Sequence, residues 1–495
     1  MRKRLLATML ALCMILTLLP VTALATDVPE TNTDSESDGN KYVEGFEEEN
    51  AEDCPYAVEV IIGFQDKKKT FYFKTFSDAA SAAENGFYIK WIDGEQEKRD
   101  YYCSDTSLSN ESDPFATMLF EQGKPYSVII DAEEPDYSKT ISENITISSE
   151  VHFKLASRTW TGGRVPDPQQ ISFTGQITIE SGGKLIQERG GTTSSANVTL
   201  SHPIQIKSGG SLKLVQVGGS TEAPKTTWNL SDGATGEAVI VVEQDASLSL
   251  VDVNIGSSED DIPAISSAGE VTIEPYNIQD ISITDIRIKN GGELVMLDTK
   301  HGATNVGSVE IDDGGTAELN HGAIDTLTLS DGAAATIDDA NITTVTLNGG
   351  SNVTLGENFA STTTAFSLPV DASVIINNVE YTPSGGAGSV DRYGNVTLPS
   401  GGSADDTVLE ANTVVTSGGV IATGATELPT INDDGSVIIP ASGGSVTVGG
   451  KTTDMPNGGS VDTSGNVTVT PNPEPEPTPD PEPEPTPDPE PSDPG

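Results

Sequence analysis

Four side chains between residues 287 and 301 have the types that acid–base chemistry requires. Arg287 and Lys289 are cationic, Asp298 is a carboxylate, and His301 carries an imidazole, which often serves as a general acid or base in enzymes. The local pattern also offers a plainer interpretation, because Arg287 sits between two isoleucines and would be the exposed residue of an alternating strand. We therefore predict no catalytic site, and we name these four residues as the candidates if the protein is an enzyme.

Acidic residues are frequent enough to make calcium binding electrostatically easy. The sequence nevertheless contains neither an Asp-x-Asp-x-Asp-Gly loop nor a Gly-Gly-x-Gly-x-Asp repeat. Its Asp pairs, such as Asp312-Asp313 and Asp338-Asp339, fall where turns are expected, and Asp favours turns. We therefore predict no metal site and no cofactor.

Two tryptophans and two cysteines complete the set of candidate residues. Trp91 or Trp160 could stack on a sugar ring, although tryptophan also packs in protein cores. Cys54 and Cys103 could form a disulfide in an exported protein, or could remain as two thiols.

The charge balance excludes whole classes of partner. The 495 residues include 26 Lys+Arg against 75 Asp+Glu, for a formal net charge of -49. Nucleic acids and anionic membrane surfaces attract clustered Lys and Arg, so we expect neither as a partner.

The N-terminal end has the pattern of a secretory signal peptide. Residues 1–25 combine a basic start, an apolar run from Leu5 to Leu19, and the small-residue site Ala23-Leu24-Ala25. An uncleaved membrane anchor is the alternative, but the apolar run is short for a membrane span. We predict a secreted or cell-surface protein with no membrane insertion after cleavage, followed by an acidic linker over residues 26–53.

Residues 471–495 alternate proline with glutamate, aspartate or threonine. Alternating prolines exclude helix and sheet and favour an extended polyproline II spacer. The sequence ends inside this spacer, so we expect either a released protein or a truncated reading of a longer one.

Residues 54–143 hold most of the aromatic residues and predict a small α/β cap. Strands are expected over Ala57–Phe64, Thr70–Lys74 and Tyr88–Ile92. Between them, four residues share one face of a short helix that Gly86 ends, namely Phe76, Ala79, Ala80 and Ala83.

Residues 144–366 contain the strongest pattern, which is a repeat of 18 residues. Val309, Leu327 and Val345 correspond, and each belongs to an apolar-x-apolar phrase that a glycine turn follows. Related phrases occur upstream at variable spacing, for example Ile177–Ile179 and Ile204–Ile206. A fixed period implies stacked coils that bury one apolar row against the next.

Residues 367–470 change to Gly-rich β-hairpin modules. Ser389–Thr397 matches Ser460–Thr468, and Ile431–Val437 is a partial third copy. Each copy places Asp-x-x-Gly, or a near relative of it, between β-branched runs, which is typical of a turn joining two strands.

The repeat resembles bacterial cell-surface proteins of the right-handed parallel β-helix (pectin-lyase-like) superfamily, and the proline-rich end resembles wall-spanning segments of Gram-positive surface proteins. The resemblance implies a mainly β fold: a right-handed parallel β-solenoid with a small α/β N-terminal cap and Gly-rich β-hairpin modules. It also implies possible chemistry, because polygalacturonase-type sites use an Asp pair, a His-Gly and an Arg-Ile-Lys. This chain has Asp260-Asp261, His301-Gly302 and Arg287–Lys289, but in a different order.

Lyases of that fold use Lys and Arg to hold a uronate and abstract a proton. Beyond Lys300 the only basic residues are Arg392 and Lys451, so such a site could lie only upstream. We therefore weigh a non-catalytic adhesin or structural stalk, with an extracellular glycan or cell-wall polysaccharide as possible partner, against a secreted polysaccharide lyase or glycoside hydrolase.

Overall fold

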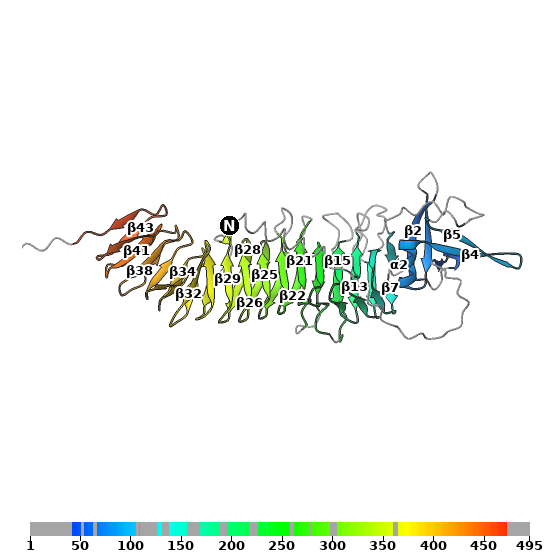
Figure 1. Ribbon diagram of the computed structural model, residues 1–495, viewed down its shortest axis with the longest axis horizontal. Coiled ribbons are helices and arrows are strands. Elements are labelled where there is room, and N and C mark those ends of the chain that lie inside the picture. The colour runs from blue at the N-terminus through cyan, green and yellow to red at the C-terminus, as the bar shows by residue number, and fades with distance from the viewer. Residues whose placement is uncertain are drawn as a thin grey trace, which may run out of the picture. The chain divides into compact units, whose positions relative to one another are not determined.

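The computed structural model describes residues 42–50, 54–62, 67–104, 108, 126–130, 138–155, 169–188, 196–216, 226–234, 236–257, 262–276, 280–297, 304–359 and 365–472. The predicted signal peptide, the rest of the acidic linker and the spacer from residue 473 lie outside these ranges. Residues 42–50 were assigned to that linker, but they belong to the folded N-terminal segment. The described chain is mainly β-structure, as the sequence predicts, and long parallel ladders form its middle (Figure 1).

The N-terminal segment is a small α/β unit. Its elements are β1 (Val43–Gly45), the 3-10 turn η1 (Glu48–Asn50), β2 (Tyr56–Ile62), β3 (Lys67–Phe73), α2 (Phe76–Asn85), β4 (Phe87–Asp93), β5 (Gln96–Tyr102) and β6 (Val128–Ile130). Strand β2 pairs antiparallel with both β3 and β6, and β1, β4 and β5 form a separate sheet.

Helix α2 begins and ends at the residues that its sequence indicates. The Thr75 hydroxyl accepts a hydrogen bond from the Asp78 amide at 3.0 Å, and Gly86 follows the last turn with φ 98°. The buried face includes Ala82, which the periodicity did not assign, whereas Ala80 is only partly buried. The buried stripe is therefore rotated around the helix, towards Ala82 and away from Ala80.

This unit packs directly on the first parallel turn. Strand β6 pairs parallel with β9 (Glu150–Leu155), and the Glu143 carboxylate accepts a hydrogen bond from the Phe76 amide at 2.6 Å. The Tyr56 ring meets Phe76 edge-on at 5.5 Å. Burial, and then the nearby Glu143 carboxylate, raise the pKa of the Tyr56 hydroxyl.

Three parallel ladders follow, and successive turns of the chain add one strand to each. The first holds β7 (Ser138–Ile141), β10 (Gln169–Phe173), β13 (Ala196–Leu200), β16 (Thr227–Leu230) and β19 (Asn254–Gly256). The second holds β8 (Ile145–Ile147), β11 (Ile177–Ile179), β14 (Ile204–Ile206), β17 (Ile240–Val242) and β20 (Ile265–Ser267). These two ladders merge in β22 (Ile281–Ile288) and continue as β24 (Thr304–Ile311), β26 (Gly322–Leu329) and β28 (Ala340–Leu347).

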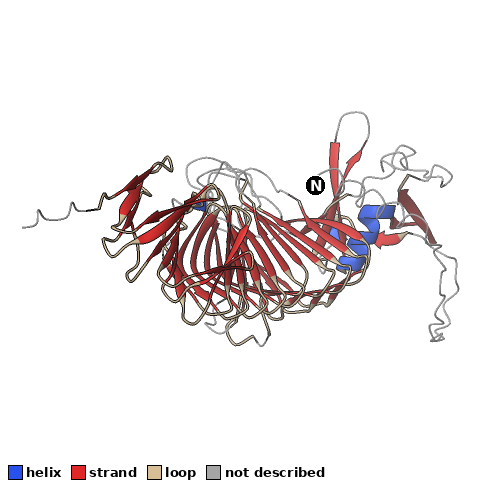
Figure 2. Ribbon diagram, turned by 60° about the vertical axis from the view of Figure 1, so that its left-hand side comes forward, coloured by secondary structure: helices blue, strands red, loops and turns tan. Residues whose placement is uncertain are grey.

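The third ladder begins with β9 and runs without merging. It continues through β12 (Lys184–Gln187), β15 (Ser211–Val215), β18 (Ser247–Val251), β21 (Glu270–Glu274), β23 (Glu293–Met296), β25 (Thr316–Leu319), β27 (Ala334–Ile337), β29 (Asn352–Leu355) and β31 (Ser373–Ile376). Figure 2 shows these strands side by side along the stack, with the helix at the end where the first turn lies.

The register confirms the 18-residue repeat. Val309 pairs with Leu327, and Leu327 pairs with Val345, so the predicted apolar column is continuous. All three side chains are buried, and they belong to one hydrophobic core that extends from Tyr56 to Val415. Alternation therefore divides each strand into inward apolar and outward polar residues.

The corners between the second and third ladders use a backbone conformation that favours glycine. Gly182 has φ 80°, in the left-handed region. Two turns later, between β17 and β18, Asp245 occupies the same corner with φ 60°. Aspartate tolerates this conformation better than most residues, so a turn without glycine at this corner still forms.

Strand β31 is the last strand that pairs in parallel, and the other strands between residues 366 and 469 pair antiparallel. The strands are β30 (Phe366–Leu368), β32 (Val379–Pro383), β33 (Gly388–Val390), β34 (Val396–Leu398), β35 (Gly402–Ala404), β36 (Thr407–Leu409), β37 (Thr413–Val415), β38 (Ile421–Gly424), β39 (Thr430–Ile431), β40 (Val437–Ile439), β41 (Gly444–Val448), β42 (Lys451–Met455), β43 (Gly459–Val461) and β44 (Val467–Val469). Two-residue turns such as Asn377-Asn378 and Asp405-Asp406 join some of them, and every central residue of these two has positive φ.

Candidate functional site

Arg287 lies on the outward face of β22, as its place between two isoleucines predicts. In the ladder it pairs with Ser266 on the preceding turn and with Glu310 on the following turn. Its side chain is 46% exposed, whereas Ile286 and Ile288 are buried. The strand pattern alone therefore positions the guanidinium at the surface.

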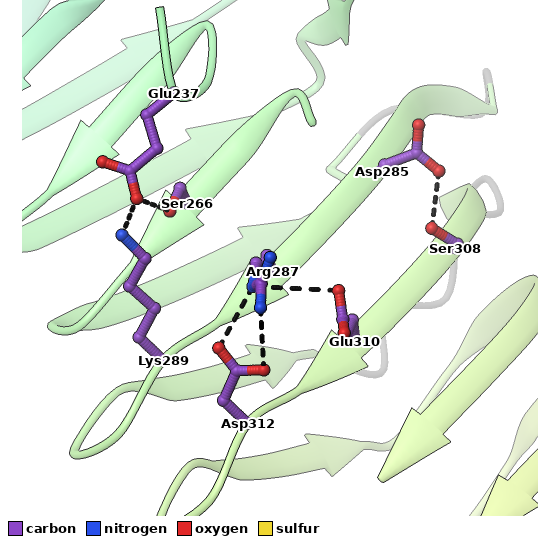
Figure 3. A network of polar contacts seen from close by, with 8 residues as sticks. All are labelled: Glu237, Ser266, Asp285, Arg287, Lys289, Ser308, Glu310 and Asp312. Atoms are coloured by element: carbon purple, nitrogen blue, oxygen red, sulfur yellow. Dashed lines mark hydrogen bonds and ion pairs between the residues drawn. The ribbon is translucent and has the colours of Figure 1, made fainter. Parts of the chain in front are cut away.

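Carboxylates of the next turn surround the Arg287 guanidinium (Figure 3). Nε and Nη2 donate to the two carboxylate oxygens of Asp312 at 3.1 and 3.3 Å, and Glu310 lies 3.7 Å from Nε. The hydrogen bond with Asp312 raises the pKa of the guanidinium further above its ordinary value. The Arg287 guanidinium thus forms a bidentate ion pair with the Asp312 carboxylate.

Lys289 is held in the same way from the other side. Its ammonium donates to Glu237, and the Ser266 hydroxyl donates to the same carboxylate oxygen at 3.5 Å (Figure 3). Beside this pair, Ser308 donates to Asp285 at 2.6 Å. The face therefore forms a lattice of polar contacts between turns, and neither basic candidate is left with an unmatched charge.

The remaining enzyme candidates lie outside the described residues. This applies to Asp298 and His301, and also to Asp260-Asp261. The structure therefore brings together Arg287 and Lys289 only, each with its own acidic partner.

A second charged cluster surrounds His152 on the outward face of β9 and β12. The imidazole Nδ1 lies 2.8 Å from Glu188 and Nε2 lies 3.1 Å from Glu150. Lys154 contacts Glu188 at 3.1 Å, and Lys184 contacts Glu150 at 3.3 Å. This is the upstream region where a lyase-type basic group would have to lie, but both lysines are paired with carboxylates.

Sequence reasoning missed the His152 cluster because it joins two segments that are distant in sequence, as Glu150 and Lys184 are 34 positions apart. The available signal was the register, since Glu150 pairs with Lys184 and His152 pairs with Ile186. Aligning the first turn with the second would have placed the acidic and basic side chains on one face.

The same cluster predicts a pH-dependent stabilisation. Burial opposes the charged form of Glu188, but hydrogen bonds from Ser127, Lys154 and His152 outweigh it and lower the pKa of that carboxyl. A carboxyl with a lowered folded-state pKa stabilises the protein above its unfolded value of about 4.3 and loses that effect as the pH falls. We expect Glu188→Gln to cost about 1 kcal/mol at pH 7 and much less at pH 3.

Urea unfolding at both pH values measures this difference. The control is Glu318→Gln, because Glu318 is exposed on β25 and forms no ion pair with the residues that the structure describes. An equal cost of Glu188→Gln at pH 7 and pH 3 would contradict the assignment.

Trp91 lies on the β4–β5 hairpin and is half-buried there, whereas Trp160 lies outside the described residues. The indole nitrogen donates to Asp100 at 3.1 Å, and the Lys98 ammonium lies 5.0 Å from the ring centroid. The stacking role of Trp91 stays a prediction.

Cys54 and Cys103 are both buried, and no disulfide joins them in the structure. Their pairing stays a hypothesis, which mass measurement before and after reduction tests.

The described residues contain no group of three or more His, Cys, Asp or Glu side chains arranged to hold a metal ion. None of the described helices is both long and apolar enough to cross a membrane.

Comparison with known proteins gives no relative from which a role for these charged clusters could be inferred. No protein-family model, no curated protein and no solved structure matches this chain.

Proposed function

We propose that the chain is an exported, non-catalytic cell-surface protein that acts as an adhesin or structural stalk and binds an extracellular glycan. Export rests on the signal-peptide pattern of residues 1–25, and the surface location rests on the proline-rich spacer. We also propose that the parallel turns form a right-handed β-helix, because crossover connections between parallel strands are right-handed in about 98% of cases.

The pairing of Arg287 and Lys289 with carboxylates supports the non-catalytic part of this proposal. Arg287 donates two hydrogen bonds to Asp312, and Lys289 is paired with Glu237. A lyase needs cations free to hold a uronate, and a hydrolase needs a carboxylate and an acid that face a substrate. Here the same groups join side chains on different turns of the stack.

A combined assay tests the proposal against the enzyme alternative. Incubating the full chain with polygalacturonate should release no unsaturated or reducing product, while immobilised polysaccharides should retain the protein. Product formation would overturn the non-catalytic assignment, and failure to be retained by any polysaccharide would remove the binding role.

We expect Arg287→Gln/Lys289→Gln to leave retention on polysaccharides unchanged. Exposed ion pairs stabilise proteins by at most about 1 kcal/mol each, so the variant should fold with a slightly lower unfolding midpoint. Retention is measured on the same immobilised polysaccharides beside the parent chain. A loss of retention with an intact fold would assign these residues to ligand binding instead.

A further inference from the structure

The two matched segments of the hairpin region form the same five-residue turn. In the first, Asp391 accepts hydrogen bonds from the amides of Tyr393 and Asn395 at 2.8 and 2.9 Å and from the Asn395 side chain at 2.8 Å. In the second, Asp462 accepts from the amides of Ser464 and Asn466 at 2.9 and 2.8 Å and from the Asn466 side chain at 2.8 Å. The backbone and the framing side chains are therefore equivalent.

The side chains at the second and third positions are not needed for this turn. They are Arg392 and Tyr393 in the first copy but Thr463 and Ser464 in the second. Because the second copy makes the same hydrogen bonds without a cation or a ring, turn formation does not explain the Arg-Tyr pair.

Tyr393 lines a surface hollow of about 300 Å³. The hollow lies where the last parallel turn meets the first hairpins, and its walls come from the end of β29, the β31–β32 turn and two hairpin turns. Phe359 is buried in the wall, whereas Glu357 and Asn378 are exposed. Asn377 is fixed by its side chain, which donates to the Ser417 carbonyl at 2.7 Å.

Arg392 fixes the Tyr393 ring at the edge of this hollow. Its guanidinium lies 4.5 Å from the ring centroid, and Nη2 donates to the phenol oxygen. The other arginines that the structure describes, Arg99 and Arg287, contact carboxylates, whereas Arg392 forms no such ion pair within the described chain. Its contacts are with the ring, so its effect here is to orient an aromatic surface.

We propose that this hollow binds one or two rings of a neutral oligosaccharide. Tyr393 lines the hollow, and an aromatic ring can pack against the C–H side of a pyranose. Glu357 and Asn378 in the same wall carry planar groups that can bond its hydroxyls. A volume of about 300 Å³ is at the lower end of small-ligand sites. A polyanion is disfavoured, because Glu357 lies in the wall and the chain has a net charge of -49.

This inference rests on the proposed glycan-binding function and identifies where that function would reside. The decisive variant is Arg392→Thr/Tyr393→Ser, which rewrites the first turn as the second. The matched control is Thr463→Ala/Ser464→Ala in the second turn. The second turn forms without an arginine or a tyrosine at these positions. The unfolding midpoint of Arg392→Thr/Tyr393→Ser should therefore match that of the parent chain.

Binding is measured by calorimetric titration of the full chain with cellohexaose, chitohexaose and an oligogalacturonate. We expect at least one neutral hexamer to bind, its affinity to fall at least about tenfold in the decisive variant, and the control to bind like the parent. Equal binding by both variants would overturn the inference and leave the glycan-binding function standing. Binding of the oligogalacturonate alone would overturn the neutral class, and binding of none would overturn the inference and the glycan-binding part of the proposed function together.

Discussion

Leu327→Asn is expected to destabilise the parallel turns by about 3–5 kcal/mol. Leu327 is fully buried between Val309 and Val345 in the inward column of the 18-residue turns. The substitution removes apolar packing and places an amide where its hydrogen bonds to water are lost. Because each turn packs only on its neighbours, the damage should be greatest in β24, β26 and β28.

The matched control for this prediction is Thr328→Asn, one residue along the same strand. Thr328 faces outward between Glu310 and Thr346, so asparagine there should cost no more than about 1 kcal/mol. Urea unfolding gives the overall loss, and amide hydrogen exchange locates it. Similar losses for the two variants would mean that the inward and outward faces are wrongly assigned.

Gly183→Asn is expected to destabilise the corner between β11 and β12 more than the same change at the adjacent Gly182. A Cβ at this position would lie 2.2 Å from the Ile147 carbonyl oxygen of the preceding turn, closer than van der Waals contact allows. The carbonyl belongs to the backbone and cannot rotate away, so the corner must move. We expect a loss of more than about 1 kcal/mol and weaker pairing between β9 and β12.

Gly182→Asn separates this steric effect from backbone strain. A Cβ at Gly182 would meet nothing within 4 Å, and its φ of 80° is one that asparagine tolerates. We expect this variant to remain within about 0.5 kcal/mol of the parent, as Asp245 shows for the equivalent corner. If Gly182→Asn were the more harmful change in thermal unfolding, the crowding argument for Gly183 would fail.

Gly182 and Gly183 show which features of the fold the sequence predicts and which depend on contacts between turns. Strand alternation and the 18-residue period predicted the inward column and the parallel stacking, because both depend on residues close in sequence. The glycine turn expected after each apolar phrase predicted the bend at Gly182. It could not predict why Gly183 follows, since that reason lies in a carbonyl 36 positions upstream that only the register brings near.

The candidate sites also combine features that neighbouring residues predict with features that depend on residues distant in sequence. The outward direction of Arg287 was predictable from alternation, but its partner Asp312 lies on the next turn and depends on a contact between turns. The cluster around His152 and the hollow beside Tyr393 were both missed, because each is assembled from segments that are distant in sequence. The sequence showed that Ser389–Thr397 and Ser460–Thr468 match. It did not show that Tyr393, at a position where the two copies differ, lines a hollow.

The change from parallel to antiparallel pairing determines how the third ladder ends after β31. A stack of identical parallel turns would leave a strand whose amides and carbonyls could recruit another chain, as growing fibrils do. Here β31 turns back through Asn377-Asn378 and pairs with β32, and the sheet finishes in the three-residue strand β36 beside Asp405-Asp406. A short edge next to two negative charges is a poor template for addition. The hairpins thus end the third ladder at an edge that favours the addition of another chain less than an unpaired parallel strand would.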